Sequence, residues 1–162
     1  MDGYNVIFSW DDLKLMAKND LQGARDSLLE ILCNFQGVTR SRVIVVFDAY
    51  RVKNNPGRQE KYKNITVVYT SESETADHFI EKYTFNFKRP YRARVVTSDG
   101  LEQVITMGHG ALRTSSREFR KEVEAANVEI RKVIERSRVK GGGQNLAVAL
   151  GDALEKRFGG NQ

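Results

Sequence analysis

Residues 42–48, RVIVVFD, form a short run of β-branched and aromatic residues that ends in an acid. Two later stretches have the same character, ITVVYT at residues 65–70 and RVVT at residues 94–97. Nearly continuous apolar character over so few residues is typical of parallel strands that are covered on both faces. The sequence therefore predicts three buried strands, at residues 42–47, 65–70 and 94–97.

Helical patterns alternate with these predicted strands. Residues 21–35 and 75–85 each place apolar side chains at three- and four-residue steps, and residues 101–105 carry a shorter pattern of the same kind. Alternating strands and helices favour an α/β sheet that is built from βαβ units. The polar, basic and turn-rich residues 50–64 are expected to form an exposed loop.

The C-terminal part of the chain has a different pattern. Residues 114–139 contain neither glycine nor proline, and apolar residues recur there at steps of four and three: Phe119, Val123, Ala126, Ile130 and Val133. This predicts one long amphipathic helix. Glycines at 141–143 end it, and a shorter helix is expected over residues 145–158. We therefore expect a first unit over residues 1–112 and a C-terminal helical extension over residues 113–162, packed on the same domain.

The composition limits the class of protein and its location. A chain of 162 residues, of which 40% are hydrophobic and 29% charged, can bury a core as one compact domain. No stretch approaches the roughly 18 apolar residues of a membrane span, so we expect no membrane association, and we expect a monomer. The single Cys33 excludes an internal disulfide and a cysteine-based zinc site, which makes the reducing cytoplasm the expected location.

The net charge of +5 and the pI of about 9.4 favour a polyanionic partner, either a nucleic acid or the ribosome. Basic residues gather at residues 51–63, 88–94 and 113–140, and tyrosines lie in or beside the first two groups. Basic side chains bind phosphates, and aromatic rings stack on exposed bases. From the first two groups we predict the RNA contacts Arg51, Lys53, Arg58, Lys88, Arg89 and Arg92. The third group also contains five glutamates, so a solvated helix face with intrahelical ion pairs is the alternative there.

Acidic residues follow each predicted strand. Asp48 comes after the first, Glu74 and Asp77 after the second, and Asp99 after the third; Asp2 would join them if a strand ended just before it. In an open α/β sheet, sites form at the carboxyl ends of the strands. Bunched carboxylates repel one another unless a cation neutralises them, and oxygen ligands favour Mg²⁺ or Mn²⁺. Such an ion can activate water against a phosphodiester, whereas the alternative is that these acids only cap helices and turns.

Taken in order, these motifs resemble the YacP-like branch of the NYN domains, which are PIN-like nucleases. The resemblance spans residues 2–139 and rests on DGYN at 2–5, VIVVFDA at 43–49, ETAD at 74–77, TSD at 97–99 and GALR at 110–113. It implies a PIN-like (NYN) parallel sheet flanked by helices over residues 1–112, followed by the helical extension. It also implies a metal-dependent endoribonuclease that acts in mRNA decay together with the ribosome.

The same resemblance implies roles for individual residues. Asp2 and Asp77 are expected to be the core catalytic acids, and Asp99 and Glu74 to be further ligands of the metal or the attacking water. Asn5 is expected to hold the first acid or the phosphate. Asp48 matches an acid of the family pattern in a supporting role. Arg113 and Arg117 match the basic stretch after the last strand and are expected to contact RNA phosphates.

The chain departs from the family pattern at its start. The pattern places an apolar strand before DGYN in the middle of the sheet, whereas only Met1 stands there, so we expect an upstream segment to supply that strand. Two other functions stay open. One is a non-catalytic RNA- or ribosome-binding module of the same fold. The other, a phosphatase or related phosphotransferase, is disfavoured because no Asp-x-Asp motif follows a strand.

Overall fold

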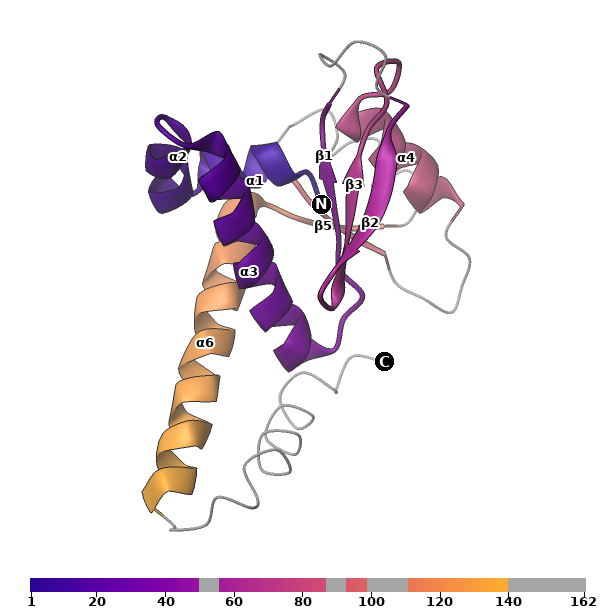
Figure 1. Cartoon of the computed structure of the whole chain (residues 1–162). Helices are drawn as coiled ribbons and strands as arrows, with labels where there is room; N and C mark the ends of the chain where they lie inside the picture. Colours follow the sequence, from indigo (N-terminus) through magenta and orange to yellow (C-terminus); the bar gives the residue numbers. More distant parts are fainter. Residues whose placement is uncertain (50–55, 87–92, 99–110, 140–162) are drawn as a thin grey trace.

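The computed structural model describes residues 1–49, 56–86, 93–98 and 111–139 (Figure 1). Three helices come first, α1 (Gly3–Ser9), α2 (Asp11–Ala17) and α3 (Leu21–Thr39). They are followed by β1 (Ile44–Phe47), β2 (Arg58–Tyr62), β3 (Ile65–Tyr69), α4 (Ala76–Phe85), β4 (Arg94–Val96) and β5 (Leu112–Thr114). The long helix α6 (Ser116–Val139) comes last. The predicted helices over residues 101–105 and 145–158 lie outside the described residues.

The strands form two ladders that the first residues of the chain join. β1 pairs in parallel with β3, β3 pairs antiparallel with β2, and β4 pairs in parallel with β5. Between β1 and β4, the Val46 amide donates to the Met1 carbonyl at 2.9 Å and the Asp2 amide donates to the Val96 carbonyl at 3.3 Å. Met1 and Asp2 therefore occupy the place for which the family pattern predicts a central strand.

The three predicted strands are confirmed as β1, β3 and β4, but the prediction of a loop over residues 50–64 is wrong in its second half. Residues 58–62 form β2, an edge strand whose residues are exposed except for the half-buried Tyr62. Polar residues suit an edge strand because only one of its sides is paired. A two-residue turn with Lys63 at φ 49° leads into β3, as tight hairpins require a positive φ.

Apolar side chains cover both faces of the sheet, which explains the unbroken apolar runs of β1 and β3. On one face, Val45 and Phe47 belong to the main core with α1, α3 and α6. On the other face, Val46 and Val68 pack with Ile80 of α4. Helices thus cover both faces of the sheet, as Figure 1 shows, and the predicted α/β architecture is confirmed.

The long C-terminal helix is confirmed as α6, which lies along α3 (Figure 1). Its predicted apolar face is buried at Phe119, Val123, Ala126 and Val133. Trp10 stacks near Phe119, with ring centroids 6.2 Å apart, and its Nε1 donates to the Ser116 carbonyl at 2.8 Å. These contacts fix the start of α6 beside α1. Among the described residues, no helix has the length and apolar character that crossing a lipid bilayer requires.

Candidate active site

Asp2 forms an isolated parallel bridge with Val46 of β1 and directly precedes α1. Its carboxylate caps α1, because Oδ1 accepts a hydrogen bond from the Asn5 amide at 3.0 Å. The helix can start this close to β1 only because the next residue is glycine. A Cβ at Gly3 would lie 2.4 Å from Cε1 of the buried Phe47 ring. The DGYN motif thus fixes the first acid against the end of β1.

The pKa of Asp2 shows which other acids lie close to it. Burial raises the pKa of the Asp2 carboxyl, and the negative charges of Asp77 and Asp48 raise it further. The Asn5 amide and the amino terminus act in the opposite direction but do not cancel the rise. The carboxylate that follows β1 and the one in the first turn of α4 therefore both act on Asp2, at the same edge of the sheet.

Asp48 is held by a threonine that the sequence did not single out. The hydroxyl of Thr70, which is buried at the end of β3, donates to Asp48 Oδ1 at 3.3 Å and accepts from the Ala49 amide at 3.0 Å. The carboxyl ends of β1 and β3 are thereby tied together beside the acids. A threonine that closes an apolar strand and faces an acid after the neighbouring strand is the only sequence signal for this contact.

Asp77 and Glu74 lie at the start of α4, where Thr75 caps the helix by accepting from the His78 amide at 3.3 Å. Asp77 is exposed in the first turn, where the positive end of the helix dipole favours a negative side chain. Glu74 Oε1 instead lies 3.8 Å from Nζ of Lys82, which is in the last turn of α4. The structure thus brings Asp77 near Asp2 and leaves Glu74 paired with a lysine.

Asn5 contacts Asp2 through its backbone, while its side chain joins two distant segments. Asn5 Oδ1 accepts from the Ser98 amide at 2.7 Å and from the Ser116 hydroxyl at 3.2 Å. Ser98 follows β4 and directly precedes Asp99, which lies outside the described residues, and the fully buried Ser116 begins α6. The sequence analysis gave no role at the site to Ser98, although it lies in the TSD motif, or to Ser116.

The donor chemistry suits a hard divalent cation, since the groups at this edge are carboxylate oxygens whose mutual repulsion a cation would relieve. Within the part of the chain that the structure describes, no group of three or more His, Cys, Asp or Glu side chains is close enough to hold a metal ion. Asp2, Asp48 and Asp77 therefore interact by charge without forming a complete ligand set. Asp99, the remaining predicted ligand, is not described.

Three of the predicted RNA-contacting arginines can be placed. Arg58 on β2 lies over the Tyr69 ring, 4.5 Å from its centroid, and Arg113 on β5 and Arg117 in the first turn of α6 are both exposed. Arg113 and Ser115 act on Glu118, since hydrogen bonds from Ser115 and then the positive charge of Arg113 lower the pKa of that carboxyl. Arg51, Lys53, Lys88, Arg89 and Arg92 lie outside the described residues.

Comparison with known proteins settles the family. A family model described as the YacP-like NYN domain matches residues 1–158. The chain belongs to the YacP-like NYN family. Among curated proteins, YacP of Bacillus subtilis (strain 168) is 39% identical over 160 residues, which cover 98% of this chain and 92% of that protein. The order of motifs that suggested the family from the sequence is thus confirmed.

Solved structures of this YacP-like NYN family have the same fold. The crystal structure of Rae1 (YacP) from Bacillus subtilis matches with a TM-score of 0.73 and 38% identity, covering 98% of this chain and 90% of that one. A mutant form of Rae1 (YacP) matches with a TM-score of 0.77 and 34% identity, covering 98% and 93%. The PIN-like (NYN) fold is therefore confirmed, and membership indicates a nuclease-type role in RNA processing, a chemistry for which such domains generally use divalent metals.

Proposed function

We propose that this protein is an endoribonuclease that hydrolyses phosphodiester bonds of mRNA with Mg²⁺ or Mn²⁺, in association with the ribosome. The observation that carries the proposal is that the Asp48 and Asp77 carboxylates lie close enough to act on the Asp2 carboxylate, at the edge where β1 and β3 end. Negative charges placed beside the Asp2 carboxylate make its ionisation more costly unless a cation neutralises them.

The proposed ligands of the ion are Asp2, Glu74, Asp77 and Asp99, with Asp48 and Asn5 in support. A divalent cation supplies Lewis-acid activation of water and neutralises charge on the phosphodiester when it is bound. A hydrogen bond from the Asn5 amide orients the Asp2 carboxylate, and a hydrogen bond from the Thr70 hydroxyl orients the Asp48 carboxylate. Since no serine or cysteine nucleophile is involved in this proposal, hydrolysis proceeds without a covalent enzyme intermediate.

The proposal extends to the rest of the chain. We assign the nuclease domain to residues 1–112 and the packed helical extension to residues 113–162, which the burial of Phe119 and Val123 in the main core supports. The basic residues Arg51, Lys53, Arg58, Lys88, Arg89, Arg92, Arg113 and Arg117 would contact RNA or the ribosome. We propose that the protein acts as a monomer in the cytoplasm.

An RNA-cleavage assay tests the proposed function. The protein is incubated with mRNA and Mg²⁺ or Mn²⁺, with and without translating ribosomes, and Asp77→Asn is compared with Asp11→Asn. Both aspartates are in the first turn of a helix, but only Asp77 acts on Asp2. We expect cleavage that requires the metal and Asp77, is retained in Asp11→Asn and is stimulated by ribosomes. No cleavage by folded wild-type protein under any of these conditions would favour the non-catalytic binding module.

A further inference from the structure

Arg25 on α3 makes its side-chain hydrogen bonds to neutral partners in the described structure. Its Nη1 donates to the Tyr4 hydroxyl at 3.2 Å and its Nη2 donates to the Gln22 side-chain oxygen, both neutral acceptors. Its Nε is buried and has no hydrogen-bond partner among the described residues. The ion pairs found there also do not include Arg25. A half-buried guanidinium with no ion pair and an unsatisfied Nε is costly, so an anionic ligand would stabilise it.

Beside this guanidinium, α1 presents an aromatic face to solvent. The Phe8 ring is 52% exposed and stacks on Tyr4, with centroids 6.4 Å apart and an interplanar angle of 26°. Tyr4 meets the buried Phe47 edge-on at 5.2 Å. Single exposed apolar residues are common on protein surfaces, but this ring continues a packed row that leads into the core. The row thus supports one face of the exposed ring.

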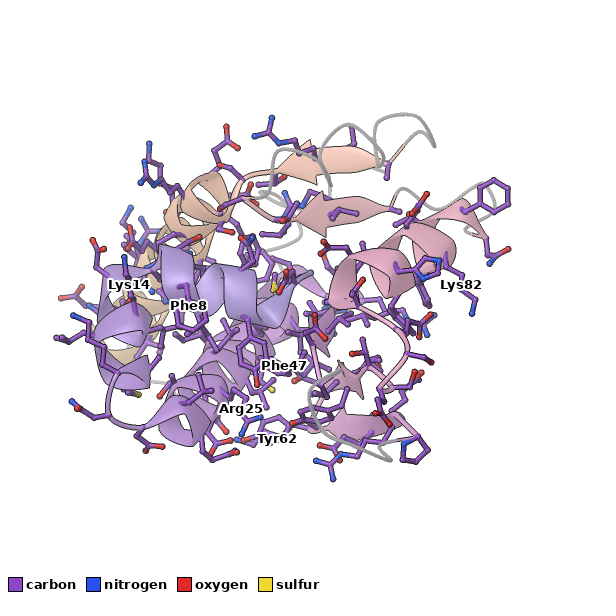
Figure 2. All side chains as sticks on the ribbon, turned by 90° about the horizontal axis from the view of Figure 1, so that it is seen from above. Phe8, Lys14, Arg25, Phe47, Tyr62 and Lys82 are labelled. Carbon is purple, nitrogen blue, oxygen red and sulfur yellow. The ribbon has the colours of Figure 1, made fainter. Side chains whose placement is uncertain are left out.

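The same row leads to the candidate active site. Phe47 directly precedes Asp48, and Phe8 lies six residues after Asp2 on α1, about 9 Å along the helix axis. Figure 2, seen from the side on which β1 and β3 end, shows Phe8 and Arg25 on the same side of Phe47, with Lys82 of α4 on the other side. A ligand that contacts Arg25 and Phe8 would therefore lie next to the acids, on the side away from Lys82.

We propose that Arg25, Tyr4 and Phe8 form a nucleotide subsite for single-stranded RNA, next to the bond that is cut. The Arg25 fork binds one backbone phosphate, and the Phe8 ring, supported by Tyr4, stacks on the neighbouring base. Guanidinium groups match phosphate geometry, and every base has a face that can stack, so the subsite recognises RNA without reading its sequence. This inference rests on the proposed function, and it adds three residues that the basic clusters of the sequence did not contain.

Binding of a short fluorescein-labelled oligouridylate, measured by anisotropy over a series of salt concentrations, tests the subsite. The measurements use the Asp77→Asn chain, so that binding is separated from cleavage. Adding Arg25→Gln should weaken binding roughly tenfold or more and lower the slope of log affinity against log salt by about 0.7. Adding Phe8→Ala should weaken binding roughly fivefold or more and leave that slope unchanged, because stacking releases no counterions.

Arg42→Gln is the matched control, since it removes the same charge just before β1, at the opposite end of the strand from Asp48. We expect it to change neither the affinity nor the slope. Phe8→Trp should keep the affinity, and its exposed indole should be quenched by the RNA, whereas the native Trp10 is buried and should not respond. Since Phe8 is on the surface, its variants test the subsite even if Arg25→Gln fails to fold.

The outcomes separate this inference from the proposed function. Unchanged affinity and slope in both Arg25→Gln and Phe8→Ala, or no binding of the oligouridylate by the Asp77→Asn chain, would overturn the subsite even if the wild type cleaves RNA. If instead the wild type does not cleave but binding responds to both substitutions as expected, the subsite stands and the nuclease proposal fails.

Discussion

Replacing Gly3 with alanine should destabilise the protein, although alanine is the better helix former. A Cβ at this position would lie 2.4, 2.7 and 2.9 Å from three atoms of the Phe47 ring. That ring is fully buried, and its centroid lies 5.2 Å from that of Tyr4 and 5.7 Å from that of Tyr69, so moving it would displace its neighbours. Overpacking of this kind costs about 1–3 kcal/mol.

Gly37 provides the matched comparison, because it also lies in a helix but has room for a methyl group. The nearest atom to a Cβ there is Asn64 Nδ2 at 3.9 Å, an ordinary contact. Gly37→Ala should therefore stabilise the protein by up to about 1 kcal/mol through helix propensity alone. The same substitution is thus expected to lower the free energy of unfolding at Gly3 and to raise it at Gly37.

Urea unfolding of the two variants and the wild type measures both effects. For a chain of this size, each kcal/mol also shifts Tm by about 2–4 °C, so a thermal scan gives an independent value. Gly3→Ala should in addition lose RNA cleavage, since a displaced α1 moves Asp2. The argument about close approach fails if Gly3→Ala is as stable as the wild type, or if Gly37→Ala is destabilised to the same degree.

Three further predictions concern the core, the first acid and the start of α6. Phe119→Ala should lower the free energy of unfolding by about 3–5 kcal/mol in urea, because the ring is only 2% exposed, whereas Val128→Ala, 47% exposed, should change it by less than about 0.5 kcal/mol. Because burial raises the pKa of Asp2 in the folded state, the ionised carboxylate destabilises the metal-free fold above that pKa. In chelator, Asp2→Asn should therefore be more stable than the wild type at neutral pH, and the difference should vanish as the pH falls below the ordinary value of 3.8; a variant less stable at neutral pH would contradict this. Ser115→Ala removes the two hydrogen bonds between the Ser115 hydroxyl and Glu118 at the start of α6, whereas the bond from the Ser115 amide to Glu118 remains. It should lower Tm but leave cleavage unchanged, since neither residue contacts Asn5; loss of cleavage at an unchanged Tm would refute it.

The helices and strands that the sequence predicted are those whose burial produces a recognisable pattern of apolar residues. β1, β3 and β4 are covered on both faces, which gives unbroken apolar runs, and α3, α4 and α6 each bury one stripe, so their apolar residues recur at three- and four-residue steps. The helices α1 and α2 have seven residues each, too few to show a helical period. The exposed residues of the edge strand β2 are all polar, so no apolar pattern marks it in the sequence. Its pairing with β3 is what makes it a strand.

The part of the candidate site that depends on which residues directly follow a strand could be predicted from the sequence. The part that depends on contacts between distant residues could not. Acids placed directly after strands could be assigned to one edge, and the action of Asp48 and Asp77 on Asp2 agrees with that expectation. The side chain of Asn5, by contrast, meets residues 93 and 111 positions away, which no spacing in the sequence reveals. The pairing of Glu74 with Lys82 likewise depends on how α4 turns toward the site.

Binding of Mn²⁺, followed by the loss of the free-ion signal in electron paramagnetic resonance, tests most directly whether the acids form a cation site. Wild-type protein and Asp11→Asn should bind the ion equally, and Asp2→Asn and Asp77→Asn should each bind it at least roughly tenfold more weakly, because each removes a charged ligand of a hard cation. Equal binding by all four proteins, or no binding by the wild type, would contradict a divalent-metal site at the edge where β1 and β3 end.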